Sequence, residues 1–449
     1  MKKSSVLVGV LVIAVALIIG GILFMRRATP PAPPQIAAPA PAPAPAPATA
    51  PTTAPTLPSA KGEIVIGVQC DRTGPTQIVG TVLCPGFHDY VALINSKGGI
   101  DGYKIKDLEI DHEYKVPPAV ESYERFKKEG AVSMAVYGTP QIYALATKLT
   151  EDRIPGTSPG FGSAAAADGE RNPFIFPIAA TYWSQGAAAV DFVKKQLGGK
   201  LKGKKIAYIF YDNPAGREPI QVIEDLASRE GFELKEFAVP PPGVEMGAQV
   251  LDIAQRFRAD FVIAHLFGGA PAVSIKEFKR VGYPLNKVVS FVWGSAEANI
   301  DAAGGFPAAE GYYTMQFAGV GQDYPVLNEI REMYKKEGKP APKEMASTVF
   351  YNRGVLIAAL HVEAIRNALK AHPDGKITGA DVKAGFEKIS GFTLGGLVPP
   401  LKITTGDHEG GGLVQIWQVK GGKFVKTTDW YSAYGDVVAK HVKEAAAKS

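Results

Sequence analysis

The feature that most constrains the fold of this chain is a regular alternation of short apolar segments with longer amphipathic ones between residues 63 and 369. The short segments are rich in β-branched and aromatic residues, and the longer ones repeat apolar residues at helical spacing. We predict strands at 63–68, 104–112, 131–137, 205–211, 233–239, 260–266, 288–293 and 311–317. We predict helices at 81–97, 116–129, 141–152, 183–197, 216–229, 247–258, 271–281, 325–337 and 349–369. Such alternation is typical of α/β folds in which helices cover both faces of parallel sheets.

The last part of the chain departs from this alternation. Segments 413–419 and 423–428 flank Gly421 and Gly422, a pattern that predicts an antiparallel β-hairpin. Residues 436–449 are expected to form a helical tail.

Length and composition narrow the class of protein. At 449 residues the chain exceeds the size at which one core usually stops growing, so two lobes are expected. Hydrophobic residues at 46% and charged residues at 21% argue against both a multi-span membrane protein and a disordered one. Four of the 49 basic residues, and none of the 44 acidic ones, fall within residues 1–60. The remainder is therefore nearly neutral and lacks basic clusters, which excludes a nucleic-acid footprint.

The N-terminal segment is expected to meet a membrane. Two lysines precede an unbroken apolar run from Val6 to Met25, long enough to cross a ~30 Å hydrocarbon core as a helix. Because two arginines follow directly, without a small-residue cleavage site, we interpret residues 1–27 as an uncleaved membrane anchor. A long signal peptide cleaved in the following Ala-rich stretch is the alternative. No cysteine lies near the end of the run, which excludes lipoprotein processing, and either interpretation predicts an exported protein.

Residues 28–60 are dominated by alternating Ala and Pro, a composition that forms no core and prefers extended polyproline geometry. At ~3.1 Å per residue this linker spans up to roughly 90 Å, so we interpret it as a stalk. Recognition of its prolines by a partner is the alternative.

The two cysteines, Cys70 and Cys84, lie close together at the start of the predicted folded part. In an exported chain such a pair predicts a disulfide, which contributes on the order of 3 kcal/mol. Two unpaired thiols are the alternative. Metal binding is not expected, because no histidine or further cysteine lies at ligand spacing nearby.

Enzyme motifs are present only in degenerate form. Residues 156–160 fit the G-x-S-x-G pattern of hydrolases, but Pro159 follows Ser158 and lacks the backbone N–H that the oxyanion hole of that motif needs. Residues 198–205 nearly fit a phosphate-binding loop, but Lys205 stands where Ser or Thr belongs. Residues 407–409 (Asp-His-Glu) lie in a Gly-rich loop and are interpreted as a solvated turn. We expect no catalysis, no metal and no cofactor; a hydrolase is a remote alternative.

In parallel sheets ligands bind beyond the carboxyl ends of the strands. The loops expected there are rich in Gly, Ser, Thr and aromatic residues, and they cover 73–77, 138–140, 157–163, 211–213, 267–269 and 293–295. Backbone amides, hydroxyls and rings that face one cleft suit an organic acid or an amino acid.

Four segments in order carry a resemblance to a known family: 64–80 (IVIGVQCDRTGPTQIVG), 94–103 (INSKGGIDGY), 260–282 (DFVIAHLFGGAPAVSIKEFKRVG) and the two late helices at 355–369 and 377–389. From Glu63 to Trp430 the chain resembles the type I periplasmic binding proteins that serve branched-chain amino acid ABC importers. The resemblance implies two α/β lobes, each a mostly parallel sheet flanked by helices, joined by three crossovers with the ligand clamped between them. Lobe 1 would comprise 61–178 plus 317–398, and lobe 2 would comprise 179–316 plus 399–435.

The resemblance also implies a site. In the leucine-binding relatives the ligand carboxylate is held after the third and fourth strands, which fall here at Thr139 and at 158–162, with Gly162 in place of a Thr. The ammonium-binding acid of the relatives falls at Ala296, one residue before Glu297, and a Tyr of the relatives is Ala215 here. The ligand-binding candidates are Gln77, Val79, Thr139, Ser158, Gly160, Phe161, Gly162, Tyr182, Tyr211, Phe267, Trp293 and Glu297.

These departures leave the ligand open. If Glu297 faces the cleft, the ligand should be an amino acid. If it faces solvent, as we favour, the ligand should be an aromatic or other apolar carboxylate; core packing is the alternative for each aromatic candidate. The resemblance implies solute capture for an ABC importer, with permease and ATPase subunits as partners. A membrane-tethered sensing module of the same fold, without transport, is the alternative.

Overall fold

The computed structural model describes residues 61–448, which belong to one contact unit of the chain, Leu57–Ser449. The predicted anchor, residues 1–27, and the predicted stalk, residues 28–60, lie outside the described residues.

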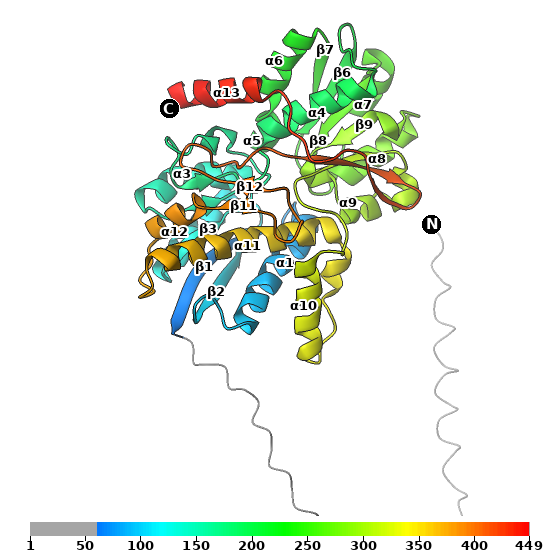
Figure 1. Ribbon diagram of the computed structural model, residues 1–449. Coiled ribbons are helices and arrows are strands. Elements are labelled where there is room, and N and C mark those ends of the chain that lie inside the picture. Colours follow the sequence, from blue (N-terminus) through cyan, green and yellow to red (C-terminus); the bar gives the residue numbers. More distant parts are fainter. Residues whose placement is uncertain (1–60, 449) are drawn as a thin grey trace, which may run out of the picture. The chain divides into compact units, whose positions relative to one another are not determined.

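The first sheet has five parallel strands and defines lobe 1 (Figure 1). The strand order is β2, β1, β3, β4, β5. The strands are β1 (Gly62–Cys70), β2 (Tyr103–Asp111), β3 (Ala131–Ala135), β4 (Gly156–Thr157) and β5 (Ile175–Phe176). The connecting helices are α1 (Gln77–Ser96), α2 (Val116–Lys128) and α3 (Thr139–Glu151). β1 pairs on both sides and is covered by helices, which explains its nearly continuous apolar sequence.

The second sheet has seven strands and defines lobe 2 (Figure 1). β7, β6, β8, β9 and β10 run parallel in that order, and the β13–β14 hairpin adds antiparallel to β10. The strands are β6 (Lys205–Tyr211), β7 (Glu233–Val239), β8 (Phe261–His265), β9 (Val288–Ser290), β10 (Tyr313–Gln316), β13 (Gln415–Lys420) and β14 (Lys423–Lys426). Its helices are α4 (Tyr182–Gln196), α5 (Pro214–Arg217), α6 (Ile220–Glu230), α7 (Gly247–Leu251), α8 (Ala270–Arg280) and α9 (Glu297–Ala302).

The chain passes three times between the lobes. It leaves lobe 1 after β5 and returns after β10 through α10 (Pro325–Lys336) and α11 (Thr348–Ala371), the latter packing along α1. It leaves again through α12 (Gly379–Phe386), β11 (Ser390–Phe392) and β12 (Leu401–Lys402) to reach β13. The α/β architecture of two lobes with three crossovers that the family resemblance implies is therefore confirmed.

The packing of α11 on α1 depends on glycine. A Cβ atom at position 354 would lie 1.9 Å from the carbonyl oxygen of Leu83, and one at position 86 would lie 2.3 Å from that of Tyr351. The two backbones therefore approach closely only because Gly86 and Gly354 carry no side chain.

Several elements differ from the predicted ones. The helix predicted at 247–258 divides into α7 and a π-helical turn at Asp252–Phe257. The strand predicted at 288–293 ends at Ser290, after which Val292–Gly294 form a 3₁₀ turn. β4 and β5 were not predicted, because each has two residues and lies in a stretch rich in Gly, Ala and Pro.

The predicted helical tail is present as α13 (Gly435–Lys448), drawn in red in Figure 1 beside α6. It contacts α4 and α6 of lobe 2 and the 3₁₀ turn Ala164–Ala167 of lobe 1. The tail therefore contacts both lobes.

Helix α1 is long and apolar enough, by length and composition, to cross a membrane. Of its most apolar window, 61% is buried inside the protein, as is typical of a core helix.

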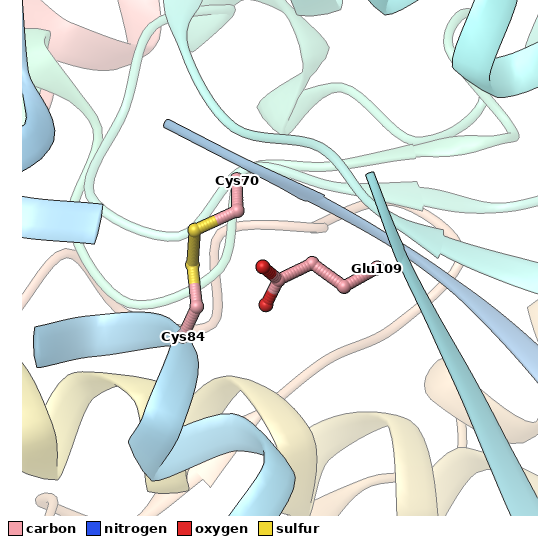
Figure 2. Close-up of side chains that lie close together, drawn as sticks. All are labelled: Cys70, Cys84 and Glu109. Carbon is pink, nitrogen blue, oxygen red and sulfur yellow. A yellow bond between two sulfur atoms is a disulfide. The ribbon is translucent and has the colours of Figure 1, made fainter. Parts of the chain in front are cut away.

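Cys70 at the end of β1 and Cys84 in α1 form the predicted disulfide. Figure 2 shows the Glu109 carboxylate beside it, with a carboxylate oxygen within 4.8 Å of both sulfurs. The disulfide offers no thiolate to a metal, and Glu109 instead accepts hydrogen bonds of 2.8 and 2.7 Å from Arg72. Nε2 of His88 lies 2.5 Å from the same carboxylate. Burial alone would raise the pKa of Glu109, but His88 and Arg72 lower it to about 2.

Candidate ligand-binding site between the lobes

A narrow cavity lined by aromatic side chains lies between the lobes. Each lining residue comes from the start of α1 or α4, or from a loop that follows a parallel strand, as expected for ligand sites in such sheets. Lobe 1 contributes Thr76, Val79, Tyr114, Tyr137 and Phe161, and lobe 2 contributes Tyr182, Phe267 and Trp293. The lining therefore has six aromatic rings and no carboxylate.

Five of the twelve predicted ligand-binding residues line this cavity: Val79, Phe161, Tyr182, Phe267 and Trp293. Tyr211 packs against Phe267, with ring centroids 4.5 Å apart. Gln77 is exposed, and its neighbour Thr76 lines the cavity instead.

Thr76 lies in the predicted cleft loop 73–77 but was not among the candidates, and sequence reasoning missed Tyr114 and Tyr137. Tyr114 follows β2 closely and Tyr137 follows β3. The rule that ligands bind at carboxyl ends of strands would have found both tyrosines if applied to every strand.

Ring contacts across the interface close the cavity. The rings of Phe161 and Trp293 stack with centroids 4.3 Å apart and planes 13° from parallel. Trp293 Nε1 also donates a 2.7 Å hydrogen bond to the carbonyl oxygen of Gly160. Gly160 has a φ of +67°, and a Cβ there would lie 2.4 Å from the ring of Phe317, so this loop conformation requires glycine.

A fully buried arginine lies behind Trp293. The guanidinium of Arg353, on α11, is 5.1 Å from the Trp293 ring and 4.6 Å from that of Phe317. It donates hydrogen bonds to the carbonyl oxygen of Val292 (2.6 Å) and to Oε1 of Gln316 (2.7 Å), while Nε has no partner. No carboxylate of the described residues lies within ion-pair distance of it. Burial lowers the pKa of Arg353 to about 9, although the negative charge of Glu297 opposes the shift.

Glu297 does not line the cavity, and it is only partly exposed because its carboxylate is bound to the start of α11. Its carboxylate accepts hydrogen bonds from the backbone N–H groups of Thr348 and Val349, at 3.1 Å each, and one from the Thr348 hydroxyl. These are the first residues of α11, where a carboxylate satisfies free N–H groups and favours the helix dipole. Burial raises the pKa of Glu297.

The predicted carboxylate-binding residues bond to one another. The Gly162 N–H donates to the Thr139 hydroxyl (3.0 Å), and the Ser158 hydroxyl donates to the carbonyl oxygen of Gly162 (3.3 Å). The hydroxyl of Ser158 is therefore directed at a carbonyl group and not at a general base.

A second acid, Glu218, lies beside these residues and escaped sequence reasoning. It follows α5 in lobe 2, and its Oε1 accepts a 2.6 Å hydrogen bond from the N–H of Ala164 in lobe 1. A Cβ at position 162 would lie 2.3 Å from its Oε2, which places that oxygen against Gly162. Burial raises the pKa of Glu218 to about 7, although hydrogen bonds from Ala164, Tyr143 and Ser163 oppose the shift.

The loop of residues 407–409 was predicted to be a solvated turn, which holds for the exposed Asp407 but is wrong for His408 and Glu409. His408 is fully buried, stacks on Phe176 with centroids 3.9 Å apart, and bonds through Nδ1 to the carbonyl oxygen of Ile175 at 2.8 Å. Glu409 accepts a 2.7 Å hydrogen bond from the Thr181 N–H, at the first crossover. The third crossover is thus tied to the first through buried polar groups.

A protein-family comparison matches the model described as periplasmic binding protein over residues 63–423. The chain therefore belongs to the periplasmic binding protein family. Its fold is that of the type I members, and membership implies an extracytoplasmic protein that binds a small molecule.

Individual relatives support the assignment to this family. The chain is 25% identical over 347 residues to a Leu/Ile/Val-binding protein homolog of Brucella suis, covering 73% of this chain and 83% of that protein. A solved structure from the Pseudomonas fluorescens group, described as an ABC transporter permease, is 31% identical with a TM-score of 0.77, covering 86% and 96% of the two chains. A solute-binding protein of R. palustris in complex with benzoate is 20% identical with a TM-score of 0.66. The alignment covers 81% of this chain and 95% of that protein.

Proposed function

We propose that this protein captures an aromatic or other apolar carboxylate between its lobes and delivers it to the permease and ATPase subunits of an ABC importer. The observation that carries the proposal is the lining of the interlobe cavity, which has six aromatic rings and no acidic side chain. Such a lining suits the flat apolar body of a ligand.

Two charged groups near the cavity, Glu297 and Arg353, favour an anion over an amino acid. A buried ammonium group costs several kcal/mol unless acceptors or a carboxylate meet it. Glu297 is the acid nearest to the position of the ammonium-binding acid in the relatives. Its carboxylate already accepts hydrogen bonds from the first residues of α11. Arg353 brings a buried positive charge close behind Trp293, which Glu297 opposes only at longer range, and this charge attracts a carboxylate.

The two lobes divide the contacts to a ligand. Phe161 belongs to lobe 1 and Trp293 to lobe 2, and their rings meet at the interface. A ligand ring between the lobes would contact side chains of both, so binding favours the closed arrangement over an open one.

Isothermal titration calorimetry of the purified full chain tests the proposal. Benzoate and longer aromatic carboxylates should bind, whereas leucine and phenylalanine should bind at least tenfold more weakly. Trp293→Ala should reduce benzoate affinity by tenfold or more, because it removes one wall of the cavity. Trp417→Ala in β13 serves as the matched control and should leave affinity unchanged. Tight leucine binding without benzoate binding would contradict the proposed ligand, and uptake of labelled benzoate that does not depend on this protein would contradict the importer role.

A further inference from the structure

The carboxylate of Glu218 lies on the lobe 1 loop that follows β4, next to the positions to which the resemblance assigns the ligand carboxylate. Its Oε1 accepts the Ala164 N–H at 2.6 Å, across the interface between the lobes. Its Oε2 is buried against Gly162 and near Thr139, because a Cβ at position 162 would meet both residues. A carboxylate of lobe 2 thus accepts hydrogen bonds from N–H groups at the end of a lobe 1 loop. This is the loop that is expected to hold the carboxylate of the ligand.

Contacts of its backbone and of the flanking helices fix Glu218 at the interface between the lobes. The indole N–H of Trp183 donates a 2.9 Å hydrogen bond to the backbone carbonyl oxygen of Glu218. Helices α3 and α5, on either side of the interface, are in contact. The position of the carboxylate is therefore a property of the closed interface, not of a mobile surface side chain.

No cation of residues 61–448 forms an ion pair with Glu218. The titratable groups that face it are the hydroxyls of Tyr143 on α3, Tyr182 on α4 and Tyr208 on β6, each with a pKa raised above its usual value. The neighbouring Arg217 is exposed and pairs with Asp212 at 2.6 Å. Within the described residues Glu218 makes no ion pair, and its pKa of about 7 is consistent with this isolation.

We propose that Glu218 is an internal substitute for the ligand carboxylate: it occupies the donors of the lobe 1 loop in the empty protein and yields them when an anionic ligand binds. The inference rests on the proposed function, because it requires a ligand that carries a carboxylate. Two carboxylates that share one buried set of donors cannot both stay ionised at little cost. Glu218 therefore takes up a proton or leaves the loop when the ligand enters.

The proposal predicts that a proton and the ligand bind together. Glu218 is mostly protonated below pH 7 and then no longer repels an anion. Benzoate affinity should therefore rise as the pH falls from 8 to 6, by up to about tenfold per pH unit. Glu218→Gln keeps the shape and removes the charge, so this variant should bind benzoate about tenfold more tightly than the natural chain at pH 8, with an affinity that no longer depends on pH.

Calorimetry of the full chain with benzoate at pH 6, 7 and 8, in two buffers of different ionisation enthalpy, measures both affinity and proton uptake. We expect uptake of up to one proton at pH 8 in the natural chain and none in Glu218→Gln. Glu224→Gln, an exposed acid on α6, is the matched control and should behave as the natural chain. Glu218→Asp keeps the charge on a shorter side chain and should retain the pH dependence.

The outcomes separate this inference from the function on which it rests. If benzoate binds and Glu218→Gln shows the affinity and pH profile of the natural chain, Glu218 has no such role, while the proposed function stands. If benzoate fails to bind and Glu218→Gln instead abolishes binding of leucine or phenylalanine, Glu218 pairs with a ligand ammonium group, and both proposals are overturned. Thermal unfolding of each variant shows whether it is folded before its affinity is compared.

Discussion

Replacing Arg353 by Met should separate the effect of a buried charge on ligand binding from its effect on stability. The guanidinium lies 5.1 Å from the centre of Trp293, and the ring of Phe161 stacks 4.3 Å beyond. A ligand carboxylate on the cavity side of Trp293 would lie about 9 Å from the charge, which at an effective dielectric constant of about 20 corresponds to about 2 kcal/mol. Benzoate affinity should therefore fall by about 20-fold.

Stability should change much less. The Met side chain leaves the carbonyl oxygen of Val292 and Oε1 of Gln316 without their donor, at a cost of about 1–3 kcal/mol each. The same replacement removes an unpaired charge whose burial costs several kcal/mol. Because the two contributions oppose each other, the free energy of unfolding should change by less than about 2 kcal/mol.

The assay compares benzoate with benzamide, which has the same ring but no charge. Arg353→Met should weaken benzoate binding and leave benzamide binding unchanged. Arg366→Met, on the same helix and paired with Glu363, is the matched control and should affect neither ligand. An equal loss for both ligands would mean that Arg353 acts through the shape of the cavity, and unchanged benzoate binding would refute the electrostatic reasoning.

Three further predictions concern stability. Cys84→Ser should lower the free energy of unfolding by about 3 kcal/mol, as measured by urea titration; two reactive thiols in the unfolded, unreduced protein would contradict the disulfide. Gly354→Ala should destabilise by about 3 kcal/mol because its Cβ would lie 1.9 Å from the Leu83 carbonyl oxygen, whereas Gly269→Ala, with open space around it, should be neutral; equal melting temperatures would refute this. Burial lowers the pKa of His88, but Asp107 and Glu109 raise it to about 9. Protonated His88 therefore stabilises the folded state fully below pH 6.5, and this stabilisation is lost as the pH rises through 9. His88→Gln should remove this loss from the pH dependence of the free energy of unfolding.

The strands and most of the helices were predictable because their apolar residues recur at the period of each element. The same pattern located Phe267 and Trp293 at the ends of predicted strands, whereas Phe161 follows β4, which was not predicted, and was located through the family resemblance. The sequence predictions that failed most clearly concern polar residues. The partners of Glu297 lie 51 and 52 residues away on α11, and the partner of Glu218 lies 54 residues away across the interface. No periodicity reports such long-range contacts, and an acid in a loop is ordinarily solvated.

The loop of residues 407–409 illustrates the same limit. Its glycines and charged residues are typical of a solvated turn, yet two further passages of the chain cover His408 and Glu409. Burial here follows from the three crossovers, which only the folded arrangement brings together. Polar residues at crossovers are therefore poorly described by local sequence, even where the fold class itself is predictable.

A crystal structure of the full chain with benzoate tests the central claim most directly. We predict the benzoate ring in the interlobe cavity, in contact with Phe161 or Trp293, and its carboxylate within hydrogen-bond distance of the loop of residues 158–164, with Glu218 displaced or protonated beside it. An empty cavity in that crystal, together with a leucine complex whose ammonium group pairs with Glu218, would contradict the account.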